Sequence, residues 1–255
     1  MTETLIKSFQ LLRDAFPDSP EAGPALSRIL LDQVASGERP ATVRLSRPGR
    51  VVAFGRRDTR SPGYPAAVAA ARDQGFGGME RLTGGRAAAY SEGALSLTLT
   101  LPDPVPGEHT DLRFREAAEL ARAAFVALGI DARTGEVPGE YCPGDYSVNA
   151  RGRVKLAGVG QRMIKGAAHV GFVIVVSDAD LIRRVLEPVY AALDLEWNPA
   201  TVGAVEDEAP GSDLETVEAA LLDQIRSRYS VAPVALDENT RRLALARAAR
   251  FRSPG

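Results

Sequence analysis

The amino-acid sequence predicts a mixed α/β fold of the α+β type, with a single mixed, largely antiparallel sheet and flanking helices. Segments with apolar residues at helical spacing are interleaved irregularly with short β-branched runs. Turn residues such as Pro48-Gly49 separate neighbouring runs and predict hairpins. A regular alternation of strand and helix is absent from the sequence, which argues against a Rossmann domain.

The N-terminal part of the chain is expected to contain two helices and several short strands. Ser19-Pro20-Glu21 supplies an N-cap, a first-turn proline and an acidic first turn for a helix that continues to about Ala35. An alanine-rich stretch predicts a second helix at 65–74. Apolar β-branched runs, the last of them alternating in period two, predict strands at 41–46, 51–55, 79–82, 86–90 and 94–101.

The C-terminal part continues with one helix, a group of strands and three further helices. Asp111 and Gly129 bound the first of these helices as start and stop signals. The pattern then predicts strands at 145–149, 153–164 and 168–176, and helices at 178–192, 214–229 and 238–250. The acidic stretch 204–213 is too short to separate two domains. We therefore expect a single domain over 1–255, with about 204–255 as a C-terminal helical extension.

Composition excludes several classes of function. The 31 basic and 33 acidic residues leave a net charge of −2, so neither a nucleic-acid partner nor a polybasic membrane contact is expected. No apolar run approaches the length of a membrane-spanning helix, and the N-terminus lacks a signal-peptide core. One cysteine allows no intrachain disulfide, which makes a cytoplasmic location the default expectation. No metal site is predicted.

Two single residues are unusual in this composition. Only three of the 31 basic residues are lysines, which raises the question of what an ammonium at Lys155 does that a guanidinium would not. The alternative is a plain surface charge. The sole cysteine, Cys142, lies in a loop between Pro138-Gly139 and Pro143-Gly144, a context that favours a reactive thiol. The alternative is a buried structural cysteine, which is common for free thiols.

Two glycine-containing segments could approach a ligand closely. In Arg81-Leu-Thr-Gly-Gly-Arg86 the paired glycines expose backbone N–H donors, and Arg81 and Thr83 add side-chain donors, although such a pair is also typical of a hairpin turn. In the predicted strand at 153–164, Gly158 and Gly160 carry no side chain and leave room for a ligand beside Lys155.

These segments together resemble the lipoate/octanoate protein ligase and transferase superfamily, which also includes the biotin protein ligases. Residues 81–90 resemble its Arg-x-Ser/Thr-Gly-Gly motif, and Lys155-Leu-Ala-Gly-Val-Gly-Gln161 resembles the core of its Gly-x-Lys-x-x-Gly-x-x-Gln segment. The segments 57–60, 91–96 and 141–144 resemble the branch that moves octanoyl groups between lipoyl domains through a cysteine. The motifs occur in the order of the family.

The resemblance covers about 25–202 and implies a fold like that of class II aminoacyl-tRNA synthetases and biotin ligases, with a tunnel for a medium-chain acyl group. It implies that Cys142 is the nucleophile and becomes an acyl thioester, and that Lys155 holds the acyl carbonyl. No cofactor is expected. The implied partners are lipoyl-domain proteins, namely the glycine cleavage H protein and the acyltransferase subunits of 2-oxoacid dehydrogenases. The implied substrate-binding residues are Arg81, Thr83, Gly84, Gly85, Gly158 and Gln161.

Two other functions are compatible with the sequence. An ATP-dependent lipoate ligase using ATP and Mg²⁺ has the same fold, but Arg86 and Ser91 stand where those ligases typically have a glycine and a histidine. A protein that binds acyl groups or lipoyl domains without catalysis is the third possibility. If the reaction starts from an amide, a proton must reach the leaving amine, and His169 and Asp145 are candidates to deliver it.

Overall fold

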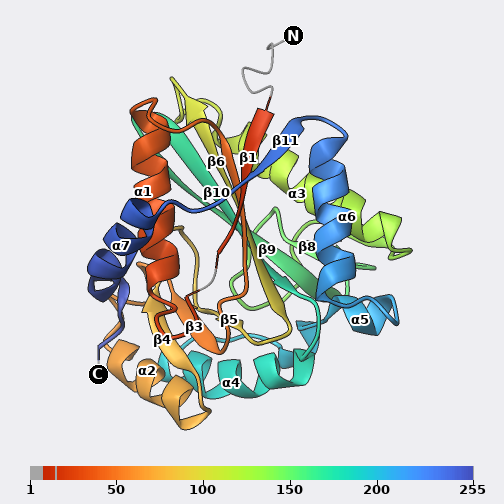
Figure 1. Cartoon of the computed structure of the whole chain (residues 1–255). Helices are drawn as coiled ribbons and strands as arrows, with labels where there is room; N and C mark the ends of the chain where they lie inside the picture. Colours follow the sequence, from red (N-terminus) through yellow and green to blue (C-terminus); the bar gives the residue numbers. More distant parts are fainter. Residues whose placement is uncertain (1–7, 15, 255) are drawn as a thin grey trace.

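The computed structural model describes residues 8–14 and 16–254, and its main element is an eight-stranded mixed sheet (Figure 1). The strand order is β11-β1-β2-β6-β10-β9-β8-β7. The pairs β11–β1 and β1–β2 are parallel and the other five are antiparallel, which confirms the predicted mixed, largely antiparallel sheet. The strands are β1 (Ser8–Arg13), β2 (Thr42–Ser46), β6 (Ala94–Asp103), β7 (Ala132–Thr134), β8 (Val148–Ala150), β9 (Val154–Ile164), β10 (Gly166–Val175) and β11 (Ser230–Val234).

Helices cover both faces of this sheet, because successive side chains of a strand point to opposite sides. On β1, Leu11 packs into the core that α3 (Thr110–Ala127) and α6 (Leu214–Arg226) form on one face. Leu12 packs on the other face against α1 (Ala22–Ala35) and α7 (Glu238–Arg247). Figure 1 shows these two helix pairs on either side of the sheet. In the described part of the chain, no helix is long and apolar enough to span a membrane.

The predicted single sheet is joined by a second, three-stranded sheet in the order β4-β3-β5, because the strands that the sequence predicts at 51–55, 79–82 and 86–90 pair with one another instead of with the large sheet. This second sheet packs with two helices around a separate apolar core, and this unit appears at the bottom of Figure 1. The loop between β4 and β5 carries the predicted acyl-binding turn. The elements are β3 (Val51–Phe54), β4 (Gly77–Glu80), β5 (Ala88–Tyr90), α2 (Tyr64–Asp73) and α4 (Ala179–Ala192), with the one-turn helix α5 (Val205–Glu208) following α4 in the chain.

The differences from the predicted elements concern short strands. The strands β1, β7 and β11 had no predicted counterpart. In β11, Pro233 weakens the strand signal, yet the structure accommodates it because β11 is the last strand of the sheet and pairs only with β1. The segment 204–255 thus contributes an edge strand as well as helices. The strand β8 begins at Val148 rather than at 145, so residues 142–147 remain a loop.

A buried ion pair joins β2 to the chain that follows β1. Arg44 Nε donates to Asp14 Oδ1 at 2.6 Å and Nη2 donates to Oδ2 at 2.9 Å, with the two side chains 6% and 0% exposed. Arg44 Nη1 also donates to the carbonyl of Gly23 and the hydroxyl of Ser27 on α1. The guanidinium therefore holds three segments together at one place.

We expect Asp14→Ala to lower the free energy of unfolding by about 3–5 kcal/mol, because it leaves the buried guanidinium of Arg44 without its counter-ion. The control is Arg13→Ala, which breaks a pair with Glu218 in which the arginine is 53% exposed, and we expect a loss of about 1 kcal/mol or less. Urea unfolding at neutral pH measures both losses. Equal losses in the two variants would contradict the assignment.

Candidate active site

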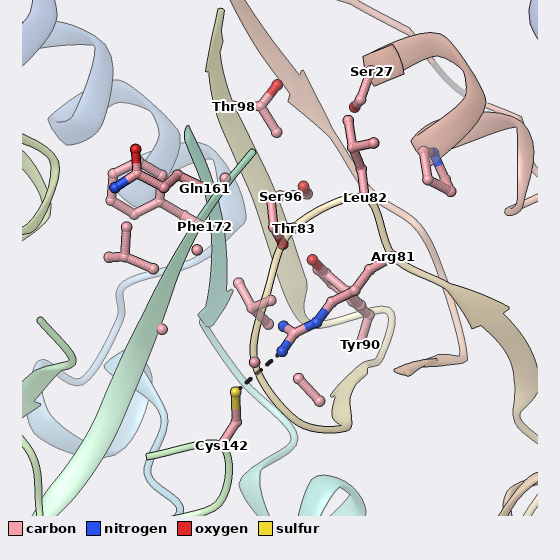
Figure 2. A pocket seen from close by; sticks show the side chains of 18 of the residues that line it. Ser27, Arg81, Leu82, Thr83, Tyr90, Ser96, Thr98, Cys142, Gln161 and Phe172 are labelled. Carbon is pink, nitrogen blue, oxygen red and sulfur yellow. Dashed lines mark hydrogen bonds between the residues drawn. The ribbon is translucent and has the colours of Figure 1, made fainter. Parts of the chain in front are cut away.

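One cavity of about 400 Å³ brings all eight predicted site residues together. Its wall includes the β4–β5 loop, the loop before β8 and part of β9, together with residues of α1, β2, β6 and β10 (Figure 2). Cys142 lies at one end, and Thr98 and Ser27 lie at the other end in this view. The predicted residues in the wall are Arg81, Thr83, Gly84, Gly85, Cys142, Lys155, Gly158 and Gln161.

The backbone of Cys142 is held in an unusual conformation. Its φ of 43° lies in the left-handed region, which residues other than glycine rarely adopt. The amide of Cys142 donates to the hydroxyl of Tyr190 on α4 at 2.7 Å, and that hydroxyl donates to the carbonyl of Ala87 at 2.9 Å. Tyr190 therefore ties the loop of Cys142 to the β4–β5 loop. No pattern in the sequence marked Tyr190, since its role depends on two segments distant in the chain.

The sulfur of Cys142 receives two hydrogen bonds from the predicted turn. Arg81 Nη2 and the backbone N–H of Arg86 each donate to Sγ at 3.2 Å, and Figure 2 shows the guanidinium directed at the sulfur. Gly85 lies between them with φ 106°, and a Cβ there would be 2.1 Å from Arg81 Nη2 and 2.8 Å from Sγ. Only glycine allows the three groups to meet in this way.

These contacts lower the pKa of the Cys142 thiol below its usual value. Burial is the largest influence and raises the pKa, but the positive charges of Arg81 and Lys155, followed by the two hydrogen bonds to Sγ, outweigh it. Burial lowers the pKa of Arg81, but the negative charge of the Cys142 thiolate and the hydrogen bond to it outweigh burial and raise the pKa. The site therefore favours the thiolate, which is the nucleophilic form of cysteine.

Lys155 is fully buried on β9, with a side chain that is 1% exposed. Its ammonium donates to Glu140 Oε1 at 2.8 Å and to the carbonyls of Tyr141 and Cys142 at 3.0 and 2.8 Å. These three acceptors use the three N–H groups that an ammonium has. Lys155 thus orders the loop that carries Cys142. It is not a surface charge.

The partner carboxylate, Glu140, was not identified from the sequence. It is buried and also accepts hydrogen bonds from the backbone of Val137 and the hydroxyl of Ser147. Because a buried ammonium needs a counter-charge, the Glu140 carboxylate is the group that compensates Lys155 in the interior. In the sequence, a buried glutamate next to an apolar residue looks the same as an exposed one.

The remaining predicted residues shape the wall. A Cβ on Gly160 would lie 3.0 Å from Thr83 Oγ1. The absence of a side chain at Gly160 therefore allows the β4–β5 loop to pack directly on the backbone of β9. A Cβ on Gly158 would lie 3.3 Å from Lys155 Cε. The amide group of Gln161 is engaged by α3, where it accepts from Arg113 Nε and donates to the carbonyl of Thr110. Gln161 therefore lines the cavity at a place remote from Cys142 (Figure 2).

The two proton-transfer candidates lie in different surroundings. His169 is buried, and burial together with the positive charge of Arg44 lowers its pKa to about 3. Its Nδ1 lies 3.1 Å from Oγ1 of Thr100, so the ring is a neutral part of the cavity wall at ordinary pH. Asp145 is exposed and belongs to the same loop as Cys142, where it also lines the cavity.

We expect Arg81→Gln to raise the pKa of Cys142, because it removes a positive charge that favours the thiolate. The pH at which iodoacetamide alkylates the thiol at half its maximal rate should move upward, as followed by intact mass. Arg153→Gln, at an exposed turn between β8 and β9, is the control and should leave the profile unchanged. Superimposable profiles for Arg81→Gln and the unmodified protein would contradict the electrostatic assignment.

The chain is similar to several known proteins. It is 32% identical over 212 residues to the octanoyl-[GcvH]:protein N-octanoyltransferase of Bacillus velezensis, covering 81% of this chain and 70% of that protein. The Anoxybacillus flavithermus protein with the same name is 33% identical over 159 residues, which span 62% of this chain and 57% of that relative. The lipoyl-[GcvH]:protein N-lipoyltransferase of Listeria monocytogenes is 27% identical, with 75% of each chain covered.

The fold is that of lipoate–protein ligases. A lipoate–protein ligase A bound with ATP has a TM-score of 0.74 at 19% identity, covering 96% of this chain and 95% of that one. A bipartite lipoate protein ligase of Thermoplasma acidophilum has a TM-score of 0.71 at 19% identity, covering 96% and 92%. The family model described as "Lipoyl protein ligase A/B catalytic domain" matches residues 19–226, a range that holds every wall residue discussed above. The chain therefore belongs to the lipoyl protein ligase A/B catalytic domain family.

Proposed function

We propose that this protein is an acyltransferase that moves an octanoyl or lipoyl group between lipoyl domains through a thioester on Cys142. The observation that carries the proposal is the thiol itself, which faces the 400 Å³ cavity and receives donors from Arg81 and the Arg86 amide. The names of the relatives, which are octanoyl and lipoyl transferases acting with GcvH, support the same chemistry. Cavities of this size typically hold small ligands.

The proposed reaction proceeds in two steps. The thiolate of Cys142 attacks the carbonyl carbon of an acylated lysine on the donor domain, the C–N bond breaks, and the leaving nitrogen takes up one proton from the solvent to depart as an amine. The lysine amine of the acceptor domain then attacks the thioester, the C–S bond breaks, the thiolate returns, and the new amide nitrogen gives one proton back to the solvent. One amide is exchanged for another, so the proposal requires neither ATP nor another cofactor.

The charge that develops on the acyl oxygen needs nearby donors. A thioester sulfur is a far poorer acceptor than a thiolate, so acylation frees the Arg81 guanidinium and the Arg86 N–H for the acyl carbonyl. Lys155 is the third donor in this proposal, and it turns one N–H toward the acyl oxygen by releasing a loop carbonyl. Its positive charge stabilises the thiolate in either arrangement.

The proposed carriers are the glycine cleavage H protein and the acyltransferase subunits of 2-oxoacid dehydrogenases. The names of the relatives support the former, since they specify GcvH. The latter carry the same kind of acyl-lysine, and the thioester mechanism makes no distinction between them. The competing function is an ATP-dependent lipoate ligase, whose fold this chain has.

The deciding experiment incubates the protein with octanoylated H protein and an apo lipoyl domain, without nucleotide. We expect the octanoyl group to move to the acceptor and an octanoyl adduct on Cys142 in the intact mass spectrum. Cys142→Ser and Cys142→Ala should lose both signals, because a hydroxyl or methyl group cannot replace the thiolate as nucleophile.

Two results would overturn this proposal. The first is robust modification of the acceptor from free octanoate or lipoate that depends on Mg-ATP, which would make the protein a ligase. The second is a Cys142→Ser variant that keeps more than a few per cent of the activity. Thermal unfolding of both variants checks that the fold persists, since the thiol itself contributes little packing.

We expect Lys155→Arg to lower the transfer rate by about 10²–10³-fold, the loss typical for one oxyanion donor. The wider, planar guanidinium cannot reproduce three bonds from one atom. Lys165→Arg is the matched control, because Lys165 is exposed. The transfer rate is measured on both variants, and near-normal turnover in Lys155→Arg would remove Lys155 from the site.

A further inference from the structure

Three exposed arginines follow β3 in a segment that the proposed chemistry does not use. Arg56, Arg57 and Arg60 are exposed, and within residues 8–14 and 16–254 no side-chain hydrogen bond or ion pair is found for them. Arg86, whose side chain is 30% exposed, lies beside this segment and pairs with Asp58. We call these four residues the arginine rim.

The arginine rim is attached directly to the turn that contacts the nucleophile. Gly55, which precedes Arg56, packs so closely on Gly85 that a Cβ there would be 1.9 Å from the Gly85 carbonyl oxygen. The buried carboxylate of Asp58 accepts from the Gly55 amide at 2.9 Å and from Arg86 Nη1 at 3.3 Å. Because the Arg86 amide donates to Cys142 Sγ, the rim lies at the Cys142 end of the cavity.

Most of the charge of the rim is uncompensated. Among the described residues, the Asp58 carboxylate pairs with Arg86 and no ion pair is found for Arg56, Arg57 or Arg60, whereas the exposed Arg47 and Arg50 have carboxylate partners in Glu215 and Glu92. The whole chain carries a net charge of −2, so this positive patch is local. Clustered like charges attract a surface of opposite sign and speed its approach.

The position of the rim argues against a small ligand. Among the described residues that line the cavity, Arg56, Arg57, Arg60 and Arg86 do not occur. The acyl group inside the cavity therefore does not touch their side chains. A folded domain that brings its acyl-lysine to Cys142 must, in contrast, cover the surface around this end of the cavity.

We propose that the arginine rim is the docking surface for an acidic face of the lipoyl domain that delivers or accepts the acyl group. This inference rests on the proposed function. The same rim meets donor and acceptor in turn, because both must present a lysine to one sulfur. Charged surfaces outside the reaction centre act mainly on association, and their effect falls as salt screens them.

The test compares R56Q/R57Q/R60Q with R153Q/R228Q/R242Q, which removes the same number of exposed arginines from other elements. For octanoylated H protein as donor, we expect kcat/KM of the rim variant to fall about 10-fold or more at low ionic strength, mainly through KM. The difference from the unmodified protein should shrink as NaCl is added. The control variant and R56K/R57K/R60K, which keeps the charge, should remain near the unmodified protein.

A second measurement separates docking from damage to the site. The rate at which iodoacetamide alkylates Cys142 should be equal in the rim variant and the unmodified protein. Equal kcat/KM losses in rim and control variants, a loss that salt does not change, or slower alkylation would each overturn the docking proposal. If the unmodified protein forms no adduct on Cys142 with the octanoylated donor, the proposed function fails instead, so the two failures are distinguishable.

Discussion

The buried ammonium of Lys155 is the interaction on which the site depends. It joins the long strand β9 to the loop of Cys142 through two backbone carbonyls and the carboxylate of Glu140. Together with the hydrogen bond from the Cys142 amide to the Tyr190 hydroxyl, these bonds hold a loop that has a left-handed residue at its centre. A buried pair of this kind is costly to break, because either charge alone would be stranded in the interior.

Close backbone contacts position the other segments of the site. Gly55 lies against Gly85, and Gly160 lies against Thr83, so three segments from different parts of the chain stack without intervening side chains. This stacking brings the Arg86 amide to the sulfur of Cys142. Glycine is therefore required at these positions, because at each of them one backbone passes close to another.

Positive charge serves two purposes around the nucleophile. Inside, Arg81 and Lys155 lower the pKa of Cys142 despite burial, and this prepares the thiolate. Outside, Arg56, Arg57 and Arg60 are exposed, at the place where we propose that the lipoyl domain docks. The two sets are connected through Asp58, which binds Arg86 while the backbone of Arg86 binds the sulfur. In our two proposals, chemistry and recognition thus share one turn of the chain.

The sequence by itself predicted the fold class and the long helices and strands, because periodicity encodes them, and it predicted eight of the residues that line the cavity through motifs that resemble a known family. Tertiary structure alone decided the short strands β1, β7 and β11, whose pairing energy comes from neighbours far along the chain. It also decided the contacts of Glu140 and Tyr190. Their roles arise from burial and from partners in other segments, and a local pattern of residue types carries no information about either.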